Sequence, residues 1–339
     1  MSRPTSARAG MRVPPLKVTR PARVAAPRGS TARSFLSLSD WSAADLQACL
    51  ALAARLKAAR AAGHRRLDTP LLGRHVALLF DKPSLRTRVT FEVAVRELGG
   101  EAISVPADVA LGGRESSADV ARNLERWVYG AVIRTFAQSR LEAFAAAAPR
   151  LRVVNALTDE EHPCQALADA LTLIEKWGDL RGRTVAFVGD GNNVAASLAQ
   201  AVAMLGGRVR VVSPAGFELP QAVRESVASV ARFGGGVEVT NDPLEGVAGV
   251  DAVYTDVWAS MGQESEADAR RAIFAPFQVN ADLMANAAPD ALFMHCLPAH
   301  RGDEVTDEVI DSPASVVFDQ SENRLHTQKA MLAILATDM

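Results

Sequence analysis

The sequence predicts an α/β protein with two doubly wound domains, each built on a mostly parallel central sheet, joined by interdomain helices. Short apolar runs alternate with longer amphipathic stretches, as strands and helices do in an open parallel sheet. This alternation begins near Phe35, stops at Gly178 and then starts again. A chain of 339 residues is long enough for about two domains.

Composition excludes several classes of protein. The chain has 48% hydrophobic residues and a formal net charge of -2, so neither a nucleic acid nor a membrane is expected as a partner. No apolar run reaches the roughly 18 residues that span a bilayer. Cys49, Cys164 and Cys296 are few and widely spaced, which argues against a disulfide framework and favours a reducing compartment.

Residues 1–33 differ from the rest because they carry eight basic residues, no acidic residue and repeated Pro. Such a segment cannot bury enough apolar area to fold, and we expect a disordered basic tail. Its composition is also typical of an organelle transit peptide, although the prolines interrupt any amphipathic helix. A start codon assigned too far upstream, with Met11 as an internal candidate, would give the same pattern. We favour a cytoplasmic protein, with an organelle matrix as the alternative.

Residues 34–164 are predicted to form the first domain. Ser39-Asp40-Trp41-Ser42 caps an Ala- and Leu-rich helix that extends to about Ala62. The buried strand 75–80 is followed by a polar turn and a helix that ends at Gly99-Gly100. The other elements expected in this domain are strands at 102–105, 131–136 and 153–156 and a helix from Ser117.

Residues 165–324 are predicted to form the second domain. A long helix that opens at 159–165 and ends near Trp177 should bridge the two domains. We expect strands at 184–189, 209–213, 252–255, 292–295 and 316–318, and a helix at 194–205. A closing helix at 327–335, within the terminal segment 325–339, should pack back on the first domain.

The turn after the first strand has the features of an anion site. Ser84, Arg86, Thr87 and Arg88 stand at a helix N-terminus, where free backbone N–H groups and the helix dipole favour negative charge. Arginine and hydroxyl side chains add the donors that a phosphate requires. Taken alone, the segment could equally be a helix cap with solvated arginines.

Other polar residues also follow predicted strands. They are Arg134, His162, Gln165, Asn193, Asp256, His295 and Cys296. Each one alone has a plain structural explanation, as a surface charge, a helix cap or a small buried residue. Because ligands of open α/β sheets bind at the carboxyl ends of the strands, their combined positions predict a cleft between the domains.

Two other motifs are incomplete, and we predict neither a cofactor nor a metal. Gly189-x-Gly191 follows a strand, but the rest of the dinucleotide fingerprint is missing and the next strand ends at Ser213-Pro214 instead of an acid. The pair His295/Cys296 lacks zinc-ligand spacing, and adjacent residues on a strand point to opposite faces.

With these residues aligned, the chain from about residue 35 onward resembles the carbamoyltransferase family, and within it the ornithine carbamoyltransferases. The motifs that carry the resemblance stand at 82–92, 159–169, 189–193, 256–264, 295–302 and 321–324. The first two are shared with aspartate carbamoyltransferases. Ser260-Met261-Gly262 and His295-Cys296-Leu297-Pro298 are more specific to the ornithine enzymes.

The resemblance implies carbamoyl phosphate and L-ornithine as substrates, and citrulline and phosphate as products. The residues implied for carbamoyl phosphate are Ser84, Leu85, Arg86, Thr87, Arg134, His162, Gln165, Cys296, Leu297 and Arg324. Those implied for ornithine are Asn193, Asp256, Ser260 and Met261. Cys296, Arg134 and His162 would be catalytic. The resemblance also implies a homotrimer or a multiple of it, a lid at Ser260–Gly262 and a cis peptide at Leu297–Pro298.

This sequence departs from the family at two places. Leu85 stands where relatives commonly have Thr, which removes a hydroxyl from the anion site. Ala110 stands where many relatives have a Gln that reaches a neighbouring subunit.

Three alternatives remain at this stage. The acceptor could be putrescine, N-acetylornithine or aspartate, or the protein could bind carbamoyl phosphate without catalysis. A dinucleotide-dependent oxidoreductase is disfavoured by the missing acid. The sequence does not determine whether the reaction runs toward citrulline or backward.

Overall fold

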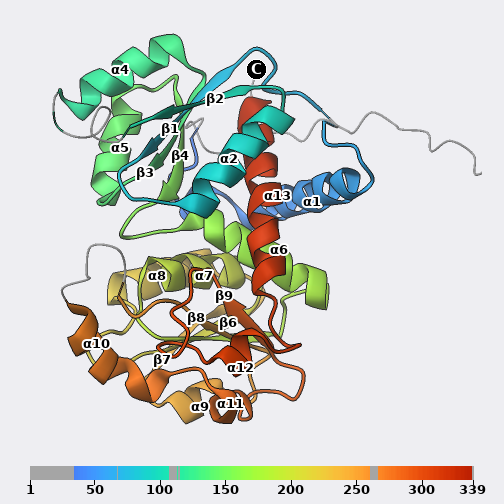
Figure 1. Ribbon diagram of the computed structural model, residues 1–339, viewed down its shortest axis with the longest axis vertical. Coiled ribbons are helices and arrows are strands. Elements are labelled where there is room, and N and C mark those ends of the chain that lie inside the picture. The colour runs from blue at the N-terminus through green and yellow to red at the C-terminus, as the bar shows by residue number, and fades with distance from the viewer. Residues whose placement is uncertain (1–33, 67, 107–112, 114, 260–265, 338–339) are drawn as a thin grey trace, which may run out of the picture.

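The computed structural model describes residues 34–337 except 67, 107–112, 114 and 260–265, and within them two parallel sheets lie one above the other (Figure 1). The first sheet has the order β2-β1-β3-β4 and the second β7-β6-β5-β8-β9. Every paired strand runs parallel to its neighbour. The predicted class, two α/β domains with parallel sheets, is confirmed. The predicted tail at 1–33 lies outside the described residues.

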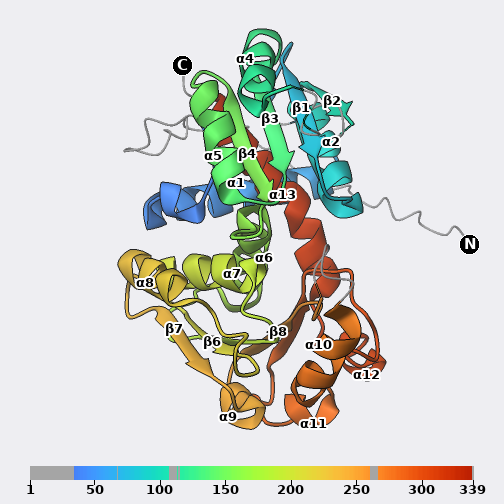
Figure 2. The ribbon, with the colours of Figure 1, turned by 90° about the vertical axis from the view of Figure 1, so that its left-hand side faces the viewer.

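The first sheet is covered by helices on both faces. Its strands are β1 (His75–Phe80), β2 (Glu101–Val105), β3 (Gly130–Arg134) and β4 (Arg152–Leu157), which cross the upper domain side by side in Figure 2. Leu78 and Phe80 join a core with α1 (Ala43–Ala61) and α2 (Leu85–Glu97). Ala77 and Leu79 face α4 (Ser117–Trp127) and α5 (Gln138–Ala147). Successive side chains of β1 point to opposite faces of the sheet, and both faces are covered. For this reason β1 is apolar from Val76 to Phe80.

The second sheet follows the same rule. Its strands are β5 (Thr184–Val188), β6 (Arg208–Val212), β7 (Gly236–Thr240), β8 (Ala252–Thr255) and β9 (Leu292–His295). Its helices are α7 (Asn193–Met204), α8 (Gln221–Val230), α9 (Pro243–Val247), α10 (Ala267–Phe274), α11 (Ala281–Met284) and α12 (Asp307–Ile310). Phe187 packs toward α7, whereas Ala186 and Val188 face the core below the sheet. Helices α5 and α8–α12 and strand β7 were not predicted from the sequence.

Two helices connect the domains. α6 (Pro163–Trp177) lies between them, and α13 (Val317–Ala336) rises from the second domain past α6 to α1 and α2 (Figure 1). Most of α13 is buried, although it carries many polar residues. Its polar side chains therefore need partners within the protein.

The strand predicted at 316–318 is wrong. Val316 is the N-cap of α13, and the helix begins ten residues before the predicted start of the closing helix. A three-residue apolar run cannot distinguish a strand from the first turn of a helix. Phe318 is 73% exposed while Val317 is buried, as the helical period requires.

The upper end of α13 is held by buried charge. The Lys329 ammonium lies 2.6 Å from a Glu97 carboxylate oxygen on α2, and Arg60 on α1 donates to the other oxygen at 3.0 Å. Near the last turn, Arg152 donates to the Leu335 carbonyl at 2.8 Å and Arg74 donates to the Ala336 carbonyl. These cations satisfy orphan carbonyls and complement the negative end of the helix dipole. None of the helices in the described residues combines the length and apolar character needed to cross a bilayer.

We expect Glu97→Ala to lower the free energy of unfolding by about 3–5 kcal/mol, because it leaves the buried Lys329 ammonium without a carboxylate. Lys329→Met should cost less, since Glu97 keeps its bond from Arg60. Urea denaturation measures both. Glu92→Ala on the same helix, which removes a surface pair with Arg96, is the control and should change stability by less than about 1 kcal/mol. A larger loss for Lys329→Met than for Glu97→Ala would contradict this assignment.

Candidate active site

The predicted anion loop forms the N-terminus of α2. Ser84 is the N-cap with extended backbone, and its hydroxyl accepts the Thr87 N–H at 3.3 Å. Arg134, at the end of the adjacent strand β3, donates to the Ser84 hydroxyl at 3.5 Å. Thr87 is buried, Arg86 is half-buried, and the Leu85 side chain is 74% exposed and points away from the core. Leu85 can therefore contribute only its backbone N–H to an anion at this terminus.

Arg134 and His162 are both buried beside this loop. Burial, reinforced by the charge of Arg324, lowers the pKa of Arg134 to about 10. Burial also holds the pKa of His162 well below its usual value, with Arg324 and Arg134 acting in the same direction, so the imidazole is neutral at pH 7. Within the described residues, Arg134 Nε, His162 Nδ1 and Arg324 Nε are buried without a hydrogen-bond partner. Unpaired buried polar atoms are rare in folded proteins, so this cluster indicates a place for a polar ligand.

Arg324 joins the two helices that border the loop. From α13 it donates to the Gln165 side-chain oxygen at 2.6 Å and to the Thr87 hydroxyl at 2.9 Å. Gln165 in turn donates to Asp169, one turn further along α6, at 2.8 Å. Burial lowers the pKa of Arg86 and of Arg324. Three arginines from α2, β3 and α13 thus converge on one buried position, which favours an anion there.

The second domain contributes Asp256 and Cys296 from the ends of β8 and β9. The Cys296 thiol donates to one Asp256 oxygen at 3.0 Å, and Asn192 donates to the other at 2.9 Å. Burial raises the pKa of the Cys296 thiol well above its usual value, and the Asp256 charge adds to that effect. Cys296 is therefore a thiol at neutral pH.

His295 supports the turn that follows β9. Its Nδ1 accepts the Leu297 N–H at 2.9 Å, and its Nε2 lies 3.2 Å from a Glu304 carboxylate oxygen. The Leu297–Pro298 peptide is cis, as predicted, and Leu297 has φ 57. The hydrogen bond from Leu297 to His295 fixes the turn that carries Cys296.

The expectation that strand alternation separates His295 from Cys296 is wrong. The potential ligand atoms of Asp256, His295 and Cys296 lie within 4.8 Å of one another. Strand alternation does not separate them, because β9 ends at His295 and Cys296 belongs to the turn. Both His295 nitrogens already have hydrogen-bond partners, so His295 has no free lone pair for a metal. The three residues are therefore not favoured as a metal site.

The remaining predicted residues divide into two groups. Asn193 donates to the Thr158 carbonyl at 2.5 Å, so its side chain reaches across to the first domain. Ser260, Met261 and Ala110 lie outside the described residues. On the flank of that segment, Arg270 pairs with Asp190 at 2.7 Å and donates to the Trp258 carbonyl at 3.0 Å.

Several supporting residues were missed by sequence reasoning. They are Thr158, Asp169, Asn192, Tyr254, Arg270 and Gln320. Asn192 and Asp169 lie inside the motifs at 189–193 and 159–169, so a closer examination of each polar residue in those motifs could have found them. Tyr254, Arg270 and Gln320 have no local sequence signal, because only the fold brings them to the site.

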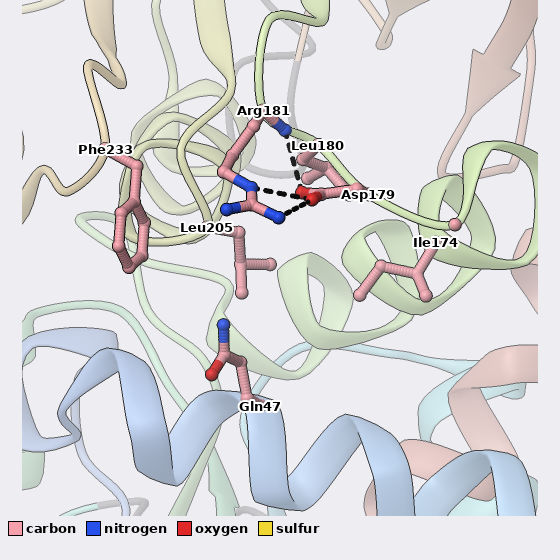
Figure 3. Close-up of a pocket in the computed structure, with 8 residues that line it drawn as sticks. Gln47, Ile174, Asp179, Leu180, Arg181, Leu205 and Phe233 are labelled. Carbon is pink, nitrogen blue, oxygen red and sulfur yellow. Dashed lines mark hydrogen bonds and ion pairs between the residues drawn. The ribbon is translucent and has the colours of Figure 1, made fainter.

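A cavity of about 300 Å³ lies elsewhere, where α1 approaches the second domain (Figure 3). Gln47, Ile174, Leu205 and Phe233 line it, together with an Arg181–Asp179 ion pair. None of the predicted site residues contributes to it. This cavity is therefore separate from the predicted site at the strand ends.

Comparison with known proteins agrees with the geometry. Residues 33–175 match the aspartate/ornithine carbamoyltransferase, carbamoyl-P binding domain, and residues 181–335 match the aspartate/ornithine carbamoyltransferase, Asp/Orn binding domain. An ornithine carbamoyltransferase of Symbiobacterium thermophilum is 52% identical over 89% of this chain and 97% of the relative. One of a Parafrankia species is 51% identical over 90% and 96%. The structure of ornithine carbamoyltransferase from Pyrococcus furiosus superimposes with a TM-score of 0.87, at 48% identity, over 91% of this chain and 98% of that one.

We expect Asp256→Asn to accelerate alkylation of Cys296 by iodoacetamide at pH 7.5, because removing the adjacent charge lowers the thiol pKa. Since the thiolate fraction changes about tenfold per pKa unit, the increase should be several-fold. Peptide mass spectrometry separates Cys296 from the buried Cys49 and Cys164. Asp251→Asn, at the opposite end of β8, is the control and should not change the rate. Slower alkylation in Asp256→Asn would contradict the assigned direction.

Proposed function

The chain belongs to the aspartate/ornithine carbamoyltransferase family, and we propose that it transfers the carbamoyl group of carbamoyl phosphate to the δ-amine of L-ornithine. The products are L-citrulline and phosphate. The observation that carries the proposal is the convergence of the buried Arg134 and Arg324 and the half-buried Arg86 near the N-terminus of α2, opposite Asp256 and Cys296. One side suits a phosphate and the other suits an amine.

Residues 34–164 are proposed to bind carbamoyl phosphate. Ser84, Arg86, Thr87 and the Leu85 backbone N–H would hold the phosphate at the helix terminus. The unpartnered donors of Arg134 and the neutral His162 are available to the carbonyl oxygen. Such donors stabilise the negative charge that develops on that oxygen during attack.

Gln165, Arg324 and the Cys296-Leu297 backbone would complete the carbamoyl site. Gln165 and Arg324 are already hydrogen-bonded to each other beside Thr87. The Cys296-Leu297 turn is held by His295 at the edge of the second domain. These contacts orient the carbonyl carbon toward the second domain, and orientation of two substrates accounts for much of the rate in such reactions.

Residues 165–324 are proposed to bind ornithine through Asn193, Asp256, Ser260 and Met261. The δ-amine must lose a proton before it attacks, since a free alkylamine has a pKa near ~10.4. Asp256 is suited to accept or direct that proton, because it is the carboxylate beside Cys296, which burial keeps as a neutral thiol. Cys296 is then catalytic as a neutral thiol that places the amine and donates a hydrogen bond to Asp256, and it does not act as a thiolate base.

The reaction balances with these groups alone. The amine nitrogen forms a bond to the carbonyl carbon, and the bond from that carbon to the phosphate oxygen breaks. Phosphate leaves with the electron pair. The ammonium form of ornithine gives up two protons: one passes to Asp256 before the attack, and the other passes to the departing phosphate after the new bond has formed. Arg86 and its neighbours neutralise the leaving charge. No cofactor or metal enters any step.

The second candidate is a carbamoyltransferase for another acceptor, such as putrescine or N-acetylornithine. Asp256 favours a substrate with an amino group near the reacting centre, which all these acceptors share. Ser260 and Met261, which lie outside the described residues, would distinguish them. A binding protein without catalysis is disfavoured by the presence of Arg134, His162, Asp256 and Cys296 in one arrangement.

We further infer that the chain acts as a homotrimer, or a multiple of it, in the cytoplasm and in arginine biosynthesis. Leu85 and Val89 on α2 and Ile103 on β2 are exposed apolar side chains on neighbouring elements, as an interface between subunits requires. Three free cysteines favour a reducing compartment. Sedimentation of wild type and Val89→Glu tests the assembly, and a wild-type monomer would contradict it.

Citrulline formation from carbamoyl phosphate tests the reaction, with ornithine, putrescine, N-acetylornithine and aspartate as parallel acceptors. We expect turnover with ornithine alone. Turnover with a different acceptor would overturn the acceptor assignment and retain the carbamoyl phosphate site. Absence of turnover with every acceptor, together with phosphate binding, would indicate the non-catalytic alternative.

Arg86→Ala should raise KM for carbamoyl phosphate and lower kcat, together at least about tenfold, since a charge-assisted bond to phosphate is worth about 1.5–3 kcal/mol. Steady-state kinetics at saturating acceptor measure both constants. Arg96→Ala, in the last turn of the same helix and paired only with Glu92 among the described residues, is the matched control. Unchanged kinetics in Arg86→Ala would refute the phosphate assignment.

A further inference from the structure

Asp169 is a buried carboxylate that the proposed function leaves without a role. It lies on α6 one turn after Gln165 and is 0% exposed. It accepts hydrogen bonds from Gln165 Nε2 at 2.8 Å, Gln320 Nε2 at 2.7 Å and the Tyr254 hydroxyl at 3.3 Å. A carboxylate in such a position costs stability unless its bonds are made, so these three donors require an explanation.

The first of these bonds determines how the Gln165 amide is oriented. An ionised carboxylate only accepts hydrogen bonds, so the side-chain nitrogen of Gln165 must face Asp169. A guanidinium only donates, so the Gln165 oxygen must face Arg324, which donates to it at 2.6 Å. The two charged partners select the same one of the two amide orientations. The oxygen therefore lies on the side of Thr87 and the anion loop.

We propose that Asp169 is a positioning residue that keeps the Gln165 oxygen toward the amino group of the bound carbamoyl moiety. This inference rests on the proposed function. An oxygen at that place accepts a hydrogen bond from an NH₂ group, and it gains nothing from a methyl group of the same size. The site then selects a carbamoyl group over an acyl group by a single contact.

The same carboxylate also connects the two halves of the site. Tyr254 is on β8 and Gln320 is on α13, and the Gln320 oxygen accepts the His295 N–H at 3.1 Å, next to Cys296. Gln320 also donates to the Tyr254 hydroxyl at 3.0 Å. A shift of Gln165 would therefore be transmitted to the turn that carries Cys296.

The protonation of Asp169 sets the conditions for a test. Burial raises the pKa of Asp169 to about 7, against the opposing effects of its hydrogen bonds and of Arg324. Above pH 8 the carboxylate is mostly ionised and only accepts hydrogen bonds. Binding should therefore be measured at pH 8.5.

Two phosphonates isolate the amino contact. Phosphonoacetamide and 2-oxopropylphosphonate share the phosphonate and the carbonyl group, and they differ only by NH₂ in place of CH₃. Wild type should bind the amide roughly three- to tenfold more tightly by titration calorimetry, as one neutral hydrogen bond allows. Asp169→Ala should bring this ratio close to one. Asp169→Asn should retain most of it, because its oxygen still accepts from Gln165.

The controls separate positioning from general damage. Thr172→Val removes an equally buried hydroxyl on α6 that also bonds a residue of α13, and it should leave the ratio unchanged. Gln165→Met should give a ratio near one, and adding Asp169→Ala to it should change the ratio no further. If Asp169→Ala does not fold, Asp169→Ser takes its place, with the same direction expected.

Three outcomes would overturn the inference or its premise. If Asp169→Ala weakens both phosphonates equally and keeps the wild-type ratio, Asp169 has only a structural role. If wild type turns over carbamoyl phosphate but shows no preference for the amide, Gln165 does not recognise the amino group. If wild type binds neither phosphonate and has no turnover, the proposed function itself fails.

Discussion

The arrangement of both domains depends on the hydrogen bonds that the buried guanidinium of Arg324 donates. It is carried by α13, which begins beside β9 in the second domain and ends against α1 and α2 in the first. Its two bonds, to Gln165 and to Thr87, are made entirely inside the protein. An uncompensated guanidinium in that position would be costly, so the helix, α6 and the anion loop must keep a fixed relation. The polar character of an almost fully buried helix follows from this requirement.

Buried charge recurs along α13 at intervals that match its neighbours. Lys329 meets Glu97 near the top, Arg324 meets Gln165 in the middle, and Gln320 meets Asp169 near the bottom. The first pair joins α13 to α2, and the other two join it to successive turns of α6. Together the three pairs fix the rotation of α13 about its axis and its position along that axis. Apolar side chains on the same helix would have allowed several packings of similar energy. The polar pairs allow only one packing of α13, and that packing places the candidate site residues of both domains.

The sequence predicted most of the architecture because strand ends and helix starts carry local signals. Ser84 as a cap, Arg134 at the end of β3 and Asp256 at the end of β8 follow from apolar runs and the polar residues after them. The helix that begins at Val317 was misread because three apolar residues fit either element. Asp169, Tyr254 and Gln320 could not be joined from sequence, since they are separated by up to 151 positions and meet only when both sheets are formed. Residues at strand ends and helix starts were predicted from local patterns and Arg324 only through the family resemblance, whereas Tyr254, Arg270 and Gln320 depend on tertiary contacts that leave no local signal.

The electrostatics of the site imply an order of events. Arg134 has its pKa lowered to about 10 by burial and by Arg324, and Arg86 adds to this repulsion, so the empty site holds cations that destabilise one another. A phosphate dianion relieves that repulsion and supplies acceptors to the buried donors of Arg134 and Arg324. The ornithine amine, in contrast, approaches through Asp256, and a cationic substrate is disfavoured while the arginines have no anion beside them. For the proposed reaction, this charge distribution favours binding of carbamoyl phosphate before ornithine. In the proposed arrangement the cations come from the first domain and from α13, and the carboxylate comes from the end of β8, so each substrate meets the opposite charge.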